Sequence, residues 1–180
     1  MQDASLVERA LAFTTESHRG QVRDVSGVPY VFHTVDVAKR LGDAGVLDEE
    51  VIAAALLHDI VEDTSVTVAE LADHFGDRVA GFVDEMTFDE AQLSKGEYLA
   101  AFATKSAGAL AIKITDRSAN VADYERESPD YAPKYAAKAH ALYSAVLARE
   151  AELGAAFGEH VAARLVAEAT RLQAFAGAPR

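Results

Sequence analysis

Seven consecutive residues, Val51–Leu57, are all apolar, and they form the longest uninterrupted apolar run of the chain. Asp48 precedes the run, in a position typical of a helix N-cap. A helix that is apolar on nearly every side must be surrounded by other elements of the fold. The run is far shorter than the roughly 20 residues that a membrane span needs. It therefore predicts a central, buried helix that begins after Asp48 and continues through His58 to about Val61.

Helical spacing of apolar residues recurs along the rest of the chain. Ser5 with Glu8, and Thr67 with Glu70, form capping-box patterns at the start of two further segments, and we expect helices there over 5–17 and 67–76. Other helices are expected over 33–44, 77–86, 97–105, 109–123, 134–153 and 158–175. No segment shows the sustained alternation of β-branched and polar residues that strands show. The predicted class is all-α, in a single domain.

The composition narrows the classes of partner and of metal site. The 180 residues include 29 acidic and 17 basic ones, which gives a net charge of −12 and argues against nucleic acid and anionic membrane as partners. No cysteine is present, so a metal would need histidine, carboxylate, carbonyl or water ligands. The first residues, Met1–Phe13, lack the basic and then apolar order of a signal peptide. We expect a cytoplasmic protein. The possibility that it forms a homo-oligomer stays open.

The apolar run is followed by a group of ionisable residues: His58, Asp59, Glu62 and Asp63. On a continuous helix His58 and Glu62 would share one face, and Asp59 and Asp63 the neighbouring one. Burying an imidazole and three carboxylates would be costly without a compensating cation. Histidine and carboxylate are suitable ligands for Mn, Fe or Zn. The pattern alone leaves two interpretations open, a metal site or a helix end that emerges into solvent.

Two other residues could contribute to such a site. His33 stands where a loop meets a predicted helix, so its side chain could point into a cleft. Asp116 follows apolar positions that we expect to be buried. Each also has an ordinary structural interpretation: His33 as a polar histidine without a ligand, and Asp116 as the partner of Lys113 or Arg117.

Five blocks of the sequence occur in a recognisable order, and they are His18–Arg23, Gly27–His33, Ala54–Thr64, Phe75–Gly76 and Lys113–Asn120. Together they resemble the HD-domain hydrolases of the RelA/SpoT-homologue group, and in particular the small alarmone hydrolases that contain the hydrolase domain alone. A His-Asp pair by itself would be weak evidence for this family, whereas five blocks in the same order are specific evidence. The resemblance implies one HD hydrolase domain over 1–180. It would be a helical bundle with a metal site in a central cleft, in which the motifs cover about 1–125 and helices over 134–176 complete the bundle.

The resemblance also assigns roles to individual residues. The ligands of one divalent metal, usually Mn²⁺, would be His33, His58, Asp59 and Asp116. Glu62 and Asp63 would position the attacking water and help to deprotonate it. Arg23 would pack on the guanine base, since a planar guanidinium suits stacking. Asn120 would lie close to the sugar and phosphate of the nucleotide, with Lys113 supporting the site.

The implied reaction removes the 3′-pyrophosphate of guanosine tetra- or pentaphosphate and yields GDP or GTP and pyrophosphate. Two alternatives stay open. One is an HD phosphohydrolase for another nucleotide, such as an adenine alarmone, the 2′-phosphate of NADPH or a nucleoside monophosphate. The other is an inactive nucleotide-binding module, although the complete set of ionisable residues argues against it.

Three residues depart from the family's pattern, namely Asp24, Thr34 and Thr115. None of them replaces an expected ligand, but Asp24 lies in the loop that would touch the nucleotide. Farther along the chain, two interpretations remain for Lys134, Tyr135 and Lys138, which would either reach the phosphate tail or lie on a helix surface.

Overall fold

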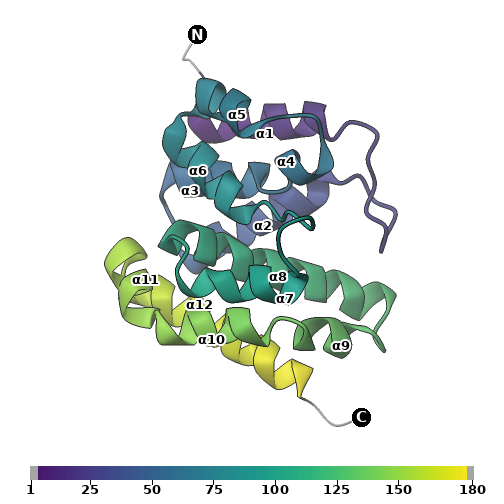
Figure 1. Cartoon of the computed structure of the whole chain (residues 1–180), viewed down its shortest axis with the longest axis vertical. Helices are drawn as coiled ribbons and strands as arrows, with labels where there is room; N and C mark the ends of the chain where they lie inside the picture. The colour runs from purple at the N-terminus through teal and green to yellow at the C-terminus, as the bar shows by residue number, and fades with distance from the viewer. Residues whose placement is uncertain (1–3, 178–180) are drawn as a thin grey trace. The chain divides into compact units, whose positions relative to one another are not determined.

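The computed structural model describes residues 4–177, so the first three residues of the N-terminal stretch lie outside the described part. The chain divides into two compact units, Met1–Thr87 and Phe88–Arg180, and each is described by itself. Helices are the regular elements of both units, as labelled in Figure 1, and no β-strand occurs within residues 4–177. A single backbone bridge joins Val22 and Pro29 in a loop. The predicted all-α class is confirmed.

The first unit is built around the predicted apolar helix. Its helices are α1 (Leu6–Ser17), α2 (Val31–Ala44), α3 (Glu49–Leu57), α4 (Ile60–Asp63), α5 (Val68–Phe75) and α6 (Asp77–Met86). Helix α3 contacts α1, α2 and α6, and six of the residues Val51–Leu57 are buried, which confirms a central helix. Asp48 caps α3 through its side chain, as predicted. Both predicted capping boxes are also present, at the starts of α1 and α5.

The prediction that the central helix continues through His58 to about Val61 is wrong. Helix α3 ends at Leu57, and a separate short helix, α4, begins at Ile60. The His58 side chain supplies a physical reason, because its Nδ1 lies 2.8 Å from the backbone oxygen of Ala55. That carbonyl is one of the last four of α3, which have no partner within the helix. His58 and Asp59 therefore lie in a turn, not on the shared helical faces that the spacing predicts.

The second unit contains one long helix in each half. Its elements are α7 (Lys95–Ala100), the 3₁₀ turn η1 (Ala101–Ala103), α8 (Ala107–Glu127), α9 (Ala132–Ala137), α10 (His140–Ala148), α11 (Glu150–Phe157) and α12 (Glu159–Ala176). Helix α12 contacts α8, α9, α10 and α11. Helix α8 is longer at both ends than the predicted 109–123, and buried residues occupy most of its length.

The prediction of one helix over 134–153 is also wrong, because this stretch forms three helices. The backbone leaves the helical region at Ala139 (φ −113°, ψ 22°) and at Arg149 (φ −110°, ψ 21°). Neither residue is a glycine or proline, so the local sequence carries no breaking signal. A contact from elsewhere in the unit accompanies the second break, where Arg149 donates a hydrogen bond to the backbone oxygen of Phe102, at 2.7 Å.

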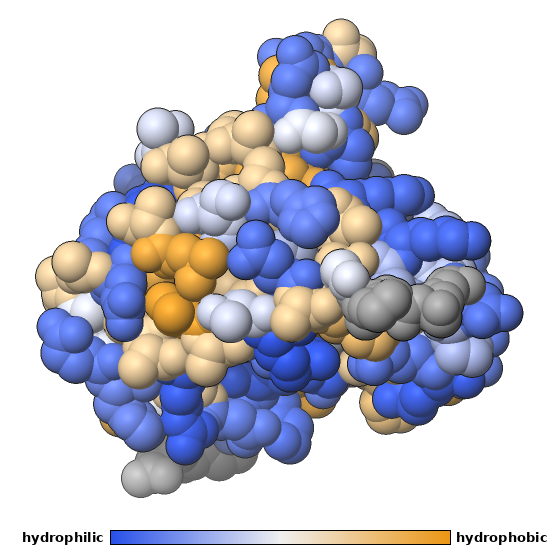
Figure 2. All heavy atoms as spheres, turned by 90° about the horizontal axis from the view of Figure 1, so that it is seen from below, coloured by the Kyte–Doolittle hydropathy of each residue, from blue (hydrophilic) through white to orange (hydrophobic). Residues whose placement is uncertain are grey.

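Figure 2 shows a mixed face, on which hydrophilic residues cover much of the surface, the most prominent group of strongly hydrophobic residues lies at the left, and weakly hydrophobic residues are spread between them. This agrees with a chain in which a quarter of the residues are charged. Among residues 4–177, no helix combines the length and the apolar character that crossing a bilayer requires.

Candidate metal centre

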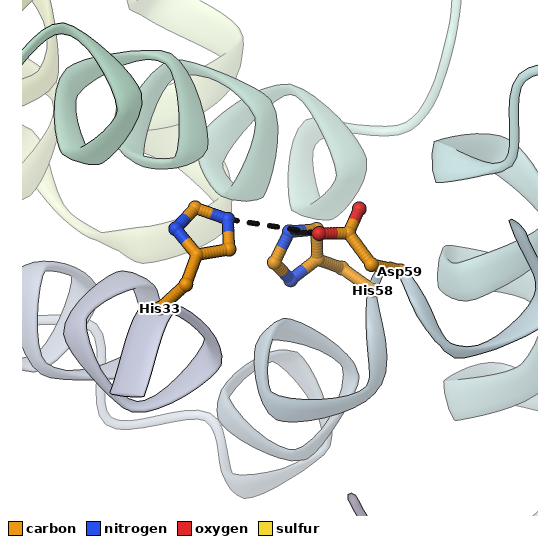
Figure 3. A group of neighbouring side chains, drawn as sticks. All are labelled: His33, His58 and Asp59. Carbon is orange, nitrogen blue, oxygen red and sulfur yellow. Dashed lines mark ion pairs between the residues drawn. The ribbon is translucent and has the colours of Figure 1, made fainter. Parts of the chain in front are cut away.

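Three of the predicted ligands meet in the first unit. His33 lies in the first turn of α2, and His58 and Asp59 lie directly after α3. Figure 3 shows both imidazole rings turned toward the Asp59 carboxylate. One possible ligand atom from each residue lies within 4.8 Å of the other two. The His33 and His58 side chains are almost completely buried, whereas 16% of the Asp59 side chain is exposed. Asp59 is therefore the most exposed of the three side chains.

The hydrogen bonding of His58 defines the role of each ring nitrogen. The backbone oxygen of Ala55 can only accept, so Nδ1 of His58 must donate to it. In a neutral imidazole, Nε2 is then an acceptor. Yet this Nε2 lies 2.9 Å from Oδ2 of Asp59, and a carboxylate oxygen is an acceptor as well. Two acceptors this close require a proton or a cation between them.

The spacing of the three side chains fits a metal ion. His33 Nε2 lies 3.6 Å from the same Asp59 Oδ2, and the centroids of the two imidazole rings are 5.3 Å apart. An ion about 2.1 Å from each of two ligand atoms holds them about 3.0 to 3.4 Å apart, at octahedral or tetrahedral angles. The two measured distances to Asp59 lie on either side of this range. His33, His58 and Asp59 can therefore hold one divalent ion with only small shifts.

Tyr30 contacts this cluster from the residue before α2. Its hydroxyl donates a hydrogen bond of 2.6 Å to Oδ2 of Asp59. Its ring stacks on His18, with ring centroids 4.8 Å apart, and the Arg23 guanidinium lies 5.4 Å from the centroid of the same ring. Tyr30 is absent from the site residues that the sequence predicts. The available signal was its spacing, three residues before His33 and on the boundary between loop and helix.

The loop between α1 and α2 is also attached to α4. Gln21 donates a hydrogen bond of 2.8 Å to the backbone oxygen of Asp63. The other atom of its amide group, Oε1, lies 2.6 Å from Nδ1 of the buried His18. The loop thus contacts both the Asp59 carboxylate and the end of α4.

Glu62 and Asp63, the predicted proton acceptors, lie on α4 and are exposed. The Asp63 carboxyl loses part of its hydration beside the protein. This loss and the negative charge of Asp59 raise its pKa, and a hydrogen bond from Tyr30 offsets part of the rise. A carboxylate with a raised pKa is a better proton acceptor than an ordinary one. The position of Asp63 on α4, four residues after Asp59, is compatible with its predicted role.

The other predicted site residues form a second group, on α8. Lys113 Nζ lies 2.9 Å from Oδ2 of Asp116, and both side chains are buried. The Asn120 amide donates to Oδ1 of Asp116, at 2.5 Å. Asp116 thus has the Lys113 partner that its ordinary structural interpretation predicts. Because Asp116 and His33 belong to different units, the fourth ligand stays a prediction.

The remaining candidates differ in exposure. Arg23 is buried, with 8% of its surface exposed. Lys134 and Lys138 are exposed, and Lys138 donates a hydrogen bond of 2.7 Å to the Tyr131 hydroxyl. Tyr135 is half-buried, and the Arg117 guanidinium lies 4.3 Å from the centroid of its ring.

Comparison with known proteins gives consistent results. Residues 10–96 match the family model described as an HD domain. The human protein named guanosine-3′,5′-bis(diphosphate) 3′-pyrophosphohydrolase MESH1 is 38% identical over 133 residues, which are 71% of this chain and 74% of that protein. A guanosine-3′,5′-bis(diphosphate) 3′-pyrophosphohydrolase of Aquifex aeolicus is 35% identical over 126 residues, which span 67% of this chain but 18% of that longer protein.

A solved structure is also similar over nearly the whole chain. It is described as a metazoan orthologue of SpoT that hydrolyses ppGpp. It aligns with 97% of this chain and 99% of its own, with a TM-score of 0.75 and 26% sequence identity. The resemblance carried by the five sequence blocks is confirmed. The chain belongs to the HD-domain hydrolases of the RelA/SpoT-homologue group.

Proposed function

We propose that this protein hydrolyses guanosine tetraphosphate and pentaphosphate at the 3′ position, releasing pyrophosphate and leaving GDP or GTP. The observation that carries the proposal is the contact between Nε2 of His58 and Oδ2 of Asp59, two acceptors 2.9 Å apart. It supports a cation at this point, beside the third donor, His33. The names of the relatives, which are 35% to 38% identical, support the substrate.

The ion we propose is Mn²⁺, held by His33, His58 and Asp59 and by Asp116 as fourth ligand. Mixed imidazole and carboxylate ligands suit this ion. When bound, a divalent ion lowers the pKa of water and neutralises charge on phosphate oxygens. The ion held by these four side chains would supply, together with Arg23 and Lys113, a positive centre for a polyphosphate substrate in an acidic chain.

Asp63, with Glu62 beside it, accepts a proton from the attacking water. The oxygen of that water bonds to the phosphorus next to the ribose 3′-oxygen, and the bond between this phosphorus and the 3′-oxygen breaks. The 3′-oxygen leaves and takes up a proton, so one water is consumed for each pyrophosphate released.

Arg23, Asn120 and Lys113 bind the nucleotide in this proposal. The Arg23 guanidinium already packs against the ring of Tyr30, and this contact limits its motion before a base stacks on it. Asn120 and Lys113 both contact Asp116, so they would place the sugar and phosphates beside the fourth ligand.

A product-resolved screen tests the proposal. The chain loaded with Mn²⁺ is incubated separately with guanosine tetraphosphate, its adenine counterpart, NADPH and nucleoside 5′-monophosphates, and every product is identified. We expect GDP and pyrophosphate from guanosine tetraphosphate, with a kcat/KM at least about a hundredfold above the others, as a site built to hydrogen-bond its substrate achieves. Preferred release of phosphate from NADPH, or preference for the adenine compound, would reassign the substrate. Nucleotide binding without turnover would leave the inactive module as the better description.

A further inference from the structure

The side chain of Tyr30 links the loop before α2 to the residue that follows His58. Its hydroxyl donates to Oδ2 of Asp59 at 2.6 Å, across 29 positions of sequence. The same Oδ2 faces Nε2 of both His33 and His58. The Tyr30 hydroxyl therefore acts on the one atom at which the three candidate ligands converge.

Several contacts within the first unit hold the Tyr30 ring in place. It stacks on His18 with an angle of 19° between the ring planes, and it lies edge to face against His33, with centroids 5.8 Å apart. The Tyr30 backbone N–H donates to the backbone oxygen of Gln21, at 3.0 Å. A ring restrained on these sides keeps its hydroxyl at a fixed point, since a tyrosine side chain has only two rotatable bonds.

We propose that Tyr30 is a positioning residue for the metal centre: its hydroxyl orients the Asp59 carboxylate so that it meets the ion together with His33 and His58. This inference rests on the proposed function in one respect, that Asp59 is a metal ligand. Groups that hydrogen-bond to metal ligands typically contribute about ten- to a hundredfold to metal affinity or activity, because they hold the ligand in its binding orientation.

The test compares Tyr30→Phe with Tyr143→Phe. Both substitutions remove one hydroxyl and keep the ring, and Tyr30→Phe retains the ring that contacts His18 and Arg23. Tyr143 is a matched control in the second unit, fully buried, with its hydroxyl donating to the backbone oxygen of Ala136 at 2.8 Å. Mn²⁺ is titrated into each metal-free protein by calorimetry, without nucleotide, and thermal melting is recorded with and without Mn²⁺.

We expect Tyr30→Phe to weaken Mn²⁺ binding by about ten- to a hundredfold. We expect the Mn²⁺-induced rise in Tm to shrink accordingly, because a ligand stabilises the folded state according to its affinity. Tyr143→Phe should lower Tm and leave Mn²⁺ affinity unchanged. In hydrolysis, the deficit of Tyr30→Phe relative to the unaltered chain should be larger at limiting Mn²⁺ than at excess Mn²⁺, while its KM for nucleotide stays near that of the unaltered chain.

Equal Mn²⁺ affinity in Tyr30→Phe and the unaltered chain would overturn the proposal, as would equal loss in both variants or absence of Mn²⁺ binding by the unaltered chain. Because the titration contains no nucleotide, its outcome does not depend on which substrate the protein hydrolyses. A chain that binds Mn²⁺ in a Tyr30-dependent way but hydrolyses no guanosine tetraphosphate would refute the proposed function alone.

Discussion

Asp59 and Asp116 are both aspartates of the predicted ligand set, yet their surroundings differ. Asp59 follows α3, and Oδ2 of its carboxylate is approached by two imidazole nitrogens and by the tyrosine hydroxyl of Tyr30. Asp116 lies within α8, where the Lys113 ammonium pairs with one oxygen and the Asn120 amide donates to the other. One carboxylate thus faces two imidazoles and a phenol, and the other faces a lysine.

This difference shows which carboxylate most needs an added cation. Burying a carboxylate is costly unless a positive charge or several hydrogen bonds compensate for the lost water. Asp116 has such a charge in its own helix. For Asp59, a metal ion held together with His33 and His58 would supply such a charge. We therefore expect substitution of Asp59 to affect the metal more than substitution of Asp116 does.

The largest effect is expected from Asp59→Asn. The amide has nearly the same shape but no charge, so it removes the ligand and leaves the packing intact. Because substitutions that only touch a ligand cost about ten- to a hundredfold, loss of the ligand itself should lower both Mn²⁺ affinity and hydrolysis by more than about a hundredfold. Calorimetric titration with Mn²⁺ and a pyrophosphate-release assay measure the two losses. Retention of either one would remove Asp59 from the site.

Asp116→Asn sharpens the comparison between the two aspartates. As a fourth ligand that must first leave Lys113, Asp116 should contribute less than Asp59, and we expect its substitution to weaken Mn²⁺ binding by about tenfold or more. The same titration measures this loss. Unchanged Mn²⁺ affinity with a lowered Tm would instead make Asp116 a structural partner of Lys113.

A smaller and different effect is expected from Arg23→Ala, which changes substrate recognition and not the ion. Stacking of a base on a side chain is worth about 1–3 kcal/mol, so KM for guanosine tetraphosphate should rise by about tenfold or more. Mn²⁺ affinity should stay within a factor of about two. Steady-state kinetics at saturating Mn²⁺ and the metal titration separate the two quantities. Equal losses in both would show that Arg23 supports the metal centre and does not bind the base.

The smallest effect concerns Asp48, an aspartate that has a guanidinium partner within the first unit. Arg78 contacts both oxygens of Asp48, at 3.1 and 2.7 Å, and this hydrogen bonding lowers the pKa of Asp48. A lowered pKa in the folded state adds stability above the ordinary pKa of about 4, and this stability is lost as the pH falls through the lowered value. Asp48→Asn keeps a good N-cap but loses the charge.

We expect Asp48→Asn to cost about 0.5–1 kcal/mol of unfolding free energy near pH 7, because Arg78 is half exposed. Urea unfolding at several pH values measures the difference between the two proteins. The difference should shrink below about pH 4 as Asp48 becomes protonated in the unaltered chain. A difference that grows on acidification would contradict the assigned direction of the pKa shift.

Local signals in the sequence predict much of the fold. Capping boxes, the N-cap Asp48 and helical periodicity act over a few residues, and the helices at both capping boxes and the central α3 form as expected. The breaks after Leu57, at Ala139 and at Arg149 were not predictable in this way. No glycine or proline marks them. The contact at the end of α3 involves the His58 ring, and the contact at Arg149 involves a residue 47 positions away.

In the candidate site, too, the local features were predictable from the sequence and the contacts between distant residues were not. The chemistry of His58 and Asp59 is visible in the sequence because the residues are adjacent and follow an apolar run. The approach of His33 to them depends on the packing of α2 against α3, which only the family resemblance anticipated. Tyr30 was missed because its hydroxyl bond to Asp59 joins residues 29 positions apart, and no local pattern encodes such a contact.

The central claim is that a cation at His33, His58 and Asp59 is required for hydrolysis of the 3′-pyrophosphate. It is tested most directly by assaying the unaltered protein on guanosine tetraphosphate after complete removal of divalent metal by a chelator, and again after Mn²⁺ is restored. We predict no GDP or pyrophosphate above background in the first assay and full recovery of both in the second. Undiminished release of GDP and pyrophosphate in the presence of the chelator would contradict the claim.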